Sequence, residues 1–400
     1  MTALPLDPDT IIQLFYWMTF IICVFTYFNY SGSGNCEKLL SRNSPVPAMM
    51  MIILYIILMG LRPVSWLFGD TINYAATYAR TLPVFSEIDW QKEWLFSLYR
   101  TWCRSMGFSV HVYFFIIEIG YLGLMFWAYK KVLWENAWFA ILFGLSAFSF
   151  FTYGVNGIRN GLACSIVTLA IVFAAKDKNY LIAAVLCFAA FGIHKSTLLP
   201  MAAMVSAIFV IKKPKLALSF WLMSIPISLV AGGPISNFLM GLGFDDRAEQ
   251  YMSANGIEEG TSVGKTGFRW DFLLYSAMPV WLIWHVQKTI ERKRLEMGIE
   301  KTIEEEESGV YGAGILADAE SMRVFNVLAV IYLLANAFWV MVIKANFSNR
   351  FAYLSWFIYP LVIAYPVIRL HIWEDQDKKA GLILLAHAGF TIVMHMLGKV

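Results

Sequence analysis

Charged side chains are scarce in this sequence, since Asp, Glu, Lys and Arg make up only 15% of its 400 residues. Soluble globular proteins average about 25%, so the composition excludes an ordinary soluble domain. Cysteine is also rare, with five residues and no Cys-x-x-Cys pair, and no external disulfide is predicted. The net charge of +3 gives no sign of nucleic-acid binding. Nothing in the sequence predicts a metal or another cofactor.

Long apolar runs take the place of the missing charge, because 59% of the residues are hydrophobic. The stretches 11–30, 111–129 and 324–343 are almost uncharged. Each has about the 20 residues that an α-helix needs to cross a bilayer. The sequence therefore predicts an all-α polytopic membrane protein, with one integral membrane domain over residues 1–400 and no cleaved signal peptide.

Short Lys-rich connections between the apolar runs predict the topology. We expect about twelve transmembrane helices, at 10–30, 47–66, 109–129, 134–153, 158–175, 180–194, 197–211, 216–232, 270–287, 322–343, 351–369 and 381–397. The positive-inside rule places the Lys-rich connections in the cytoplasm and both termini outside. The long loops are then 67–108 and 233–269 on the outer side and 288–321 on the cytoplasmic side.

Arginine and lysine are unequally divided between the two predicted sides. The cytoplasmic side has 13 Lys and 5 Arg, and the outer side has 8 Arg and 5 Lys. A point charge such as Lys is sufficient to set topology, whereas the planar fork of Arg grips phosphate or carboxylate with two hydrogen bonds. We therefore expect an anion to be held on the outer face.

The first outer loop contains a predicted amphipathic helix. Large apolar side chains recur every four residues, at Trp90, Trp94, Leu98 and Trp102. This spacing predicts a helix that lies in the membrane interface. A plain aromatic anchor explains the Trp residues equally well, but it does not explain Glu93, whose carboxylate would be partly desolvated beside two indole rings.

Polar residues of the predicted outer face form the candidate site. They are Arg62, Asp70, Asn73 and Tyr74 after the second span; Asn156, Arg159 and Asn160 at the start of the fifth; His194 and Lys195 between two short spans; Arg269 before the ninth; and Arg350 near the eleventh. A helix start supplies unpaired N–H groups and partial positive charge beside Arg159. For any single Arg the alternative is snorkelling or an internal ion pair, for which the candidate carboxylates are Asp70, Glu93, Asp245, Asp246 and Asp271.

Five short motifs resemble one known family. They are GLRP…FGDTINY from Gly60, EWLF from Glu93, GIRNGLACSI from Gly157, HKSTLLP from His194 and NRFAYL from Asn349. Their order and spacing resemble the EpsG family of bacterial exopolysaccharide proteins, which is grouped with the Wzy-type polymerases. The resemblance implies a GT-C-like glycosyltransferase fold. It also implies action on polyprenyl-pyrophosphate-linked oligosaccharide, at the outer face of the bacterial cytoplasmic (inner) membrane.

The chemistry of such a polymerase gives the candidate residues their roles. Cations must hold the leaving pyrophosphate, and we expect Arg159 and Arg350 to do so with support from Arg62 and Arg269. A base must accept the proton of the attacking sugar hydroxyl, and Asp70, Glu93 and His194 are the candidates. We expect one of the two carboxylates to be the base ahead of His194. The glycan would contact Asn73, Tyr74, Asn156, Asn160 and Lys195. The partners implied are the lipid-linked oligosaccharide, membrane lipid, and a chain-length regulator and flippase of the same pathway.

Three other functions are alternatives to a polymerase. A flippase of lipid-linked oligosaccharide would need polar residues near the membrane midplane, accessible from each side in turn. A glycan ligase or a transferase that uses a polyprenyl-phosphate sugar would differ only in its donor. A non-catalytic scaffold would have no need of outer Arg residues. The clustering toward one side favours the polymerase over the flippase.

Overall fold

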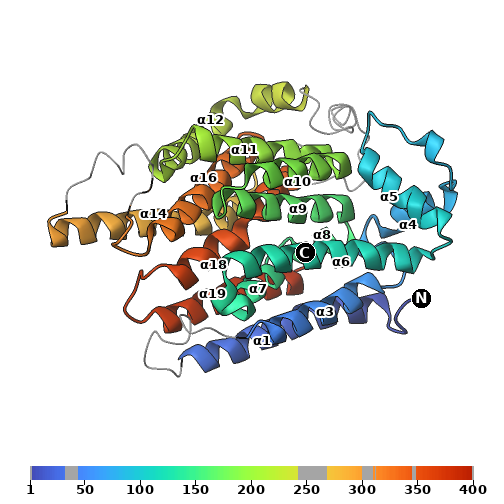
Figure 1. Cartoon of the computed structure of the whole chain (residues 1–400), viewed down its shortest axis with the longest axis horizontal. Helices are drawn as coiled ribbons and strands as arrows, with labels where there is room; N and C mark the ends of the chain where they lie inside the picture. The colour runs from blue at the N-terminus through green and yellow to red at the C-terminus, as the bar shows by residue number, and fades with distance from the viewer. Residues whose placement is uncertain are drawn as a thin grey trace. The chain divides into compact units, whose positions relative to one another are not determined.

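The computed structural model describes residues 2–31, 44–241, 268–299, 310, 312–344 and 348–398. These residues form α-helices and short 3₁₀ helices, and an isolated bridge between Ala313 and Ala317 is the only β pairing among them. Figure 1 labels the helices. The chain divides into two compact units. The first contains Met1–His194 and Ile363–Val400, and the second contains Lys195–Val362.

The first unit is built around the helix α9 (Ile158–Ala175), which packs against α6 (Val110–Val132) and α10 (Tyr180–Ile193). Its other helices are α1 (Pro8–Ser31), α3 (Val46–Gly60), α4 (Thr71–Arg80), α5 (Trp94–Ser105), α7 (Ala137–Leu145), α8 (Phe150–Val155) and α19 (Gln376–Met396). Three 3₁₀ helices, η1 (Trp66–Phe68), η2 (Phe85–Glu87) and η3 (Trp134–Asn136), join them. The helix α3 packs against α6, and α5 packs against the end of α10.

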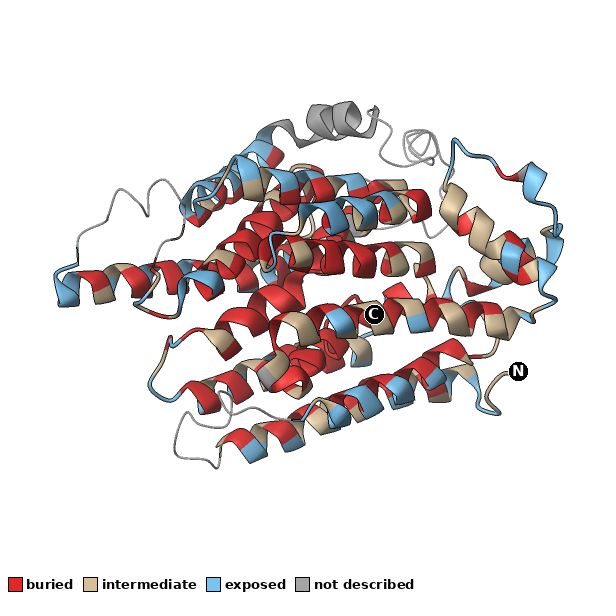
Figure 2. Cartoon of the chain, viewed as in Figure 1, coloured by how far each residue is buried: buried red, intermediate tan, exposed pale blue. Residues whose placement is uncertain are grey.

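The first and last helices of the chain, α1 and α19, pack against one another within this unit. The ring of Tyr16 stacks on His395 with a centroid separation of 4.2 Å. The backbone of Gly381 lies against Tyr27, where a Cβ atom would come 3.2 Å from the ring. The opposite face of α1 carries exposed apolar side chains such as Phe25 and Phe28, as expected for a helix in contact with lipid (Figure 2).

The second unit is centred on α16 (Ala319–Met341), which packs against α11 (Leu198–Phe209), α12 (Pro214–Gly241) and α17 (Ser348–Trp356). The helix α14 (Trp270–Met297) also belongs to it, and α18 (Tyr359–Arg369) runs across the boundary between the units. A buried amide ties these helices together. Asn336 of α16 accepts from Trp221 Nε1 at 2.7 Å and donates to Ser355 Oγ at 2.9 Å and to Ser276 Oγ at 3.2 Å.

Six helices in the described ranges are long and apolar enough to cross a membrane. They are Pro8–Ser31, Val110–Val132, Ile158–Ala175, Ala319–Met341, Arg350–Arg369 and Gln376–Met396, and four shorter apolar helices accompany them. The prediction of a helical, multi-pass membrane protein is therefore confirmed. The total of twelve spans is not established by these helices and stays a prediction.

Several boundaries differ from the expected ones. The predicted span 134–153 is broken into α7 and α8, and polar side chains of α19 lie at the break. Thr391 donates to the Ser146 carbonyl at 2.7 Å, and His387 Nδ1 lies 3.0 Å from Ser146 Oγ. The helix α14 continues to Met297, so part of the predicted cytoplasmic loop is helical. In the outer loop 233–269, α12 extends to Gly241, and Asp245 and Asp246 lie outside the described residues.

The predicted topology can be tested by cysteine labelling in a background that lacks the native Cys residues. We expect Cys at positions 213 and 379 to react with a membrane-impermeant maleimide only from the cytoplasmic side, because Lys-rich connections stay inside. Cys at positions 70 and 195 should react only from the outer side. Labelling of position 195 from the cytoplasm alone would contradict a site on the outer face.

Candidate functional site

Three of the predicted residues meet in the first unit, around the carboxylate of Glu93. Glu93 immediately precedes α5, Arg159 is the second residue of α9, and His194 follows the last residue of α10. Arg159 Nη1 donates to Glu93 Oε2 in an ion pair, and His194 Nδ1 contacts Glu93 Oε1. We call Glu93, Arg159 and His194 the Glu93 cluster. Their side chains are 12%, 26% and 19% exposed, so the cluster is shielded from solvent but not sealed.

Close packing of α5 on α10 positions Glu93. A Cβ atom at Gly192, two residues before His194, would come 2.8 Å from Trp94 Cε2 and 3.0 Å from Leu95 Cβ. Only glycine therefore permits this approach. Trp94 also lies against Phe188, with ring centroids 5.6 Å apart, and these contacts hold the start of α5 beside the end of α10.

Replacing Gly192 with Ala should therefore disturb the Glu93 cluster without removing any polar group. We expect it to cost about 1–3 kcal/mol of stability through overpacking and to lower the reaction rate, because Trp94 and Glu93 must move together. Thermal unfolding in detergent and a turnover assay would measure the two effects. Gly123→Ala in α6 is the matched control, since nothing lies within 4 Å of its added Cβ atom. Equal behaviour of the two variants would contradict this positioning.

A second group of predicted residues joins α4 to the start of α9. Tyr74 of α4 accepts a hydrogen bond from Arg159 Nε at 3.2 Å. The Nε atom of this guanidinium therefore reaches α4, while its Nη1 atom reaches Glu93 before α5. The backbone N–H of Asp70 donates to Asn156 Oδ1 at 2.8 Å. Asn73 donates to Asp70 Oδ1 at 3.0 Å. Asp70 lies one helical turn before Tyr74, which places both side chains near the same edge of α4.

The charges of the Glu93 cluster favour the ionised carboxylate. Burial alone would raise the pKa of Glu93, but the hydrogen bond and charge of His194 and the charge of Arg159 outweigh it and lower the pKa. Glu93 is therefore ionised at neutral pH and is a weak base there. Its carboxylate is placed to orient the imidazole of His194.

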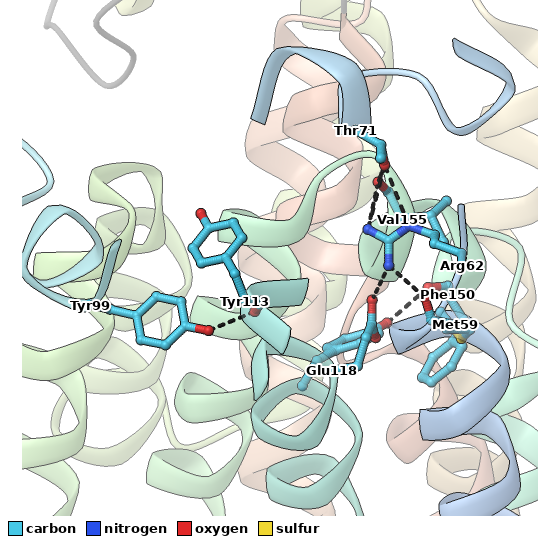
Figure 3. A network of polar contacts seen from close by, with 9 residues as sticks. Met59, Arg62, Thr71, Tyr99, Tyr113, Glu118, Phe150 and Val155 are labelled. Carbon is cyan, nitrogen blue, oxygen red and sulfur yellow. Dashed lines mark hydrogen bonds and ion pairs between the residues drawn. The ribbon is translucent and has the colours of Figure 1, made fainter. Parts of the chain in front are cut away.

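Arg62 lies in the same unit and is fully buried. Its Nη1 donates to Glu118 Oε1 at 3.1 Å and to the Met59 carbonyl at 2.6 Å, and its Nη2 donates to the Val155 carbonyl at 3.3 Å (Figure 3). Glu118 was not among the predicted site residues. It is an acidic residue within an apolar span, and the rule that such residues are functional by default would have singled it out.

The remaining predicted residues are distributed over the two units. Asn160 accepts a hydrogen bond from Cys164 in α9. Arg269, in the second unit, makes a two-point contact with Asp271, at 2.9 and 2.7 Å. Lys195 and Arg350 also belong to the second unit, and both are half-buried. Within the described ranges, no group of three or more His, Cys, Asp or Glu side chains is arranged to hold a metal ion.

Comparison with known proteins gives one match. The model of the family described as the EpsG family matches residues 46–398, which include α3 and the whole Glu93 cluster. No curated protein and no solved structure matches the chain.

Proposed function

Because this chain belongs to the EpsG family, we propose that it is a membrane-bound polysaccharide polymerase. Its donor would be an oligosaccharide carried on polyprenyl pyrophosphate, and its acceptor a second lipid-linked oligosaccharide. The reaction would take place at the outer face of the bacterial cytoplasmic membrane and need no nucleotide. The helical, multi-pass architecture supports a GT-C-like glycosyltransferase fold.

The reaction exchanges one bond at the anomeric carbon of the donor. A hydroxyl oxygen of the acceptor sugar forms a glycosidic bond to that carbon, and the bond from the carbon to the pyrophosphate breaks. The hydroxyl proton passes to a base on the protein, and the polyprenyl pyrophosphate leaves with the electron pair. Catalysis therefore needs a cation at the leaving group and a base at the acceptor.

The observation that carries the proposal is the single carboxylate shared by a guanidinium and an imidazole. Arg159 can grip a pyrophosphate bidentately, and the helix start beside it adds partial positive charge. An arriving pyrophosphate would compete with Glu93 for the Arg159 guanidinium. Glu93 would keep its contact with His194 Nδ1 during this exchange. One side chain thus links donor binding to the orientation of the base.

We assign the base to His194 ahead of Glu93 and Asp70. Both carboxylate oxygens of Glu93 are already engaged, one by Arg159 and one by His194, whereas an imidazole held by a carboxylate is a common general base. Asp70 would contact the acceptor sugar together with Asn73 and Asn156. Asn160, in the same unit, keeps its predicted role as a glycan ligand. The roles expected for Arg269, Arg350 and Lys195, which belong to the second unit, stay predictions.

The decisive experiment uses purified protein in lipid nanodiscs with one defined polyprenyl-pyrophosphate oligosaccharide and no nucleotide sugar. A ladder of products that grows by whole repeat units, with release of polyprenyl pyrophosphate, is the expected result. Unchanged donor that appears on the opposite leaflet of a proteoliposome would show a flippase instead. Transfer of one finished glycan to a different acceptor, without a ladder, would show a ligase.

A further inference from the structure

The buried Arg62–Glu118 ion pair makes no contact with Glu93, Arg159 or His194, since Arg62 contacts Met59, Thr71, Glu118 and Val155. The role expected for Arg62 from the sequence, support of the pyrophosphate, is replaced here by a different one. Arg62 follows α3, and Glu118 lies in the middle of α6. Both side chains are 0% exposed, and the Arg62 guanidinium lies 4.8 Å from the centroid of the Phe114 ring. Desolvating two charges costs several kcal/mol per ion, so stability alone is a weak reason for this arrangement.

The contacts of Arg62 extend to the two segments that form the site. Its Nε and Nη2 atoms each lie 3.4 Å from Thr71 Oγ1, and Nη2 also donates to the Val155 carbonyl. Thr71 Oγ1 itself donates to that carbonyl at 2.6 Å. Thr71 is the first residue of α4, and Val155 is the last residue of α8 (Figure 3).

Thr71 and Val155 are each adjacent in sequence to a residue of the candidate site. Asp70 precedes Thr71, and Asn156 follows Val155; the pair is joined by the 2.8 Å hydrogen bond between them. Gly69, with φ of +62°, makes that bond possible, because a Cβ atom there would come 2.5 Å from Asn156 Oδ1. Further along the same two segments, Tyr74 meets Arg159. Three contacts thus join the α4 region to the α8–α9 segment: Thr71 with Val155, Asp70 with Asn156, and Tyr74 with Arg159. The ion pair fixes the first of them, through Arg62.

We propose that Glu118 and Arg62 are positioning residues, which act through Thr71 and the Val155 carbonyl to set where Tyr74 and Arg159 are held. This inference rests on the proposed function, because it concerns the alignment of the proposed pyrophosphate ligand. Glu118 depends on Arg62 for its geometry, since its Oε2 atom has no hydrogen-bond partner among the described residues. Arg62 and Glu118 thus hold the end of α3 against α6. We call this ion pair, together with the Thr71 hydroxyl that Arg62 contacts, the clamp.

Thr71 offers the sharpest test, because Thr71→Val removes the hydroxyl with almost no change in shape. We expect its kcat to fall by about tenfold or more, since misplacement of catalytic groups by about 1 Å can cost about 10²-fold. Donor affinity should stay close to that of the wild type, because the misalignment acts on the transition state. The thermal midpoint should fall, because Arg62 and the Val155 carbonyl lose a buried hydrogen-bond partner. Thr71→Ser, which keeps the hydroxyl, should restore most of the rate. Thr77→Val, on the exposed face of α4, is the matched control and should behave as wild type.

Glu118→Gln tests the other end of the clamp. It keeps an oxygen for Arg62 but leaves the guanidinium charge without compensation, so we expect kcat to fall and the thermal midpoint to fall with it. Wild-type kcat in Thr71→Val, or a loss of rate in Thr71→Val that Thr71→Ser does not restore, would overturn the proposal.

A readout that does not depend on polymerase activity separates this inference from the proposed function. In a background without native Cys, the pair Asp70→Cys and Asn156→Cys should form a disulfide in membranes, because the side chain at position 156 reaches the backbone of residue 70. Adding Thr71→Val should slow that cross-link, and adding Thr77→Val should not. An unchanged cross-linking rate in both backgrounds would overturn the clamp even if the protein proves not to be a polymerase. A slowed rate without any polymer from the wild-type protein would overturn the proposed function alone.

Discussion

Replacing Arg159 with Lys should lower the rate of polymer formation by about 10²-fold, comparable to the loss of one donor to a developing oxyanion. Lysine keeps the positive charge but not the planar fork, so it cannot serve Tyr74 and a phosphate group at the same time. In the present structure the same fork reaches Glu93 through Nη1 and Tyr74 through Nε. The rate of repeat-unit addition at saturating donor is the measurement that shows the effect.

The control for this experiment is Arg80→Lys, which makes the same change at the exposed last turn of α4. It should leave the rate unchanged while it reproduces any general effect on insertion or yield. Protein amount in the membrane should be similar for both variants, because neither removes a charge. Wild-type turnover by Arg159→Lys would show that the residue contributes only charge, and the proposed pyrophosphate ligand would have to be sought elsewhere.

Substitution of His194 by Gln should have the second large effect, a loss of about 10²–10⁴-fold, which is the usual contribution of a general base. Donor binding should remain, because Arg159 and Tyr74 are untouched. A binding assay with labelled donor and a polymerisation assay on the same preparation would separate the two properties. Asp70→Asn should be less severe, since its carboxylate is placed beside Asn73 and away from the Glu93–His194 contact.

The variant Glu93→Gln distinguishes an orienting carboxylate from a base. If His194 is the base, Glu93→Gln should keep a reduced but measurable rate, because glutamine still offers an oxygen to orient the imidazole. A Glu93→Gln rate that is negligible at every pH, together with substantial activity in His194→Gln, would assign the base to Glu93.

Much of the helical architecture could be predicted from the sequence because apolar length and charge spacing act locally. The two short helices on either side of His194 are an example, since α10 and α11 are both shorter than a full span. The break between α7 and α8 could not be predicted in this way. The polar groups of Ser146 at this break contact Thr391 and His387, which are 245 and 241 positions away in the sequence. A hydropathy window contains no information about such partners.

In the candidate site, too, single residues could be predicted from the sequence, whereas their contacts could not. The sequence singled out Glu93, Arg159 and His194 one at a time, from desolvation, a helix start and a short connection. It could not assign Glu93 to Arg159, since the two are 66 positions apart and their contact depends on how α5 packs on α10. Nor could it assign Arg62 to Glu118, because their pairing depends on the packing of α3 on α6.

The packing of α1 against α19 has a consequence for the order in which the protein is made. The ribosome synthesises α1 first and α19 last, and the whole second unit, Lys195–Val362, comes between them. At about 5–20 residues per second, translation of that unit takes roughly 10 to 30 s. During this interval the face of α1 on which Tyr16 will stack with His395 has no partner from α19. The unit that begins first is thus completed only after the second unit and α19 have been made.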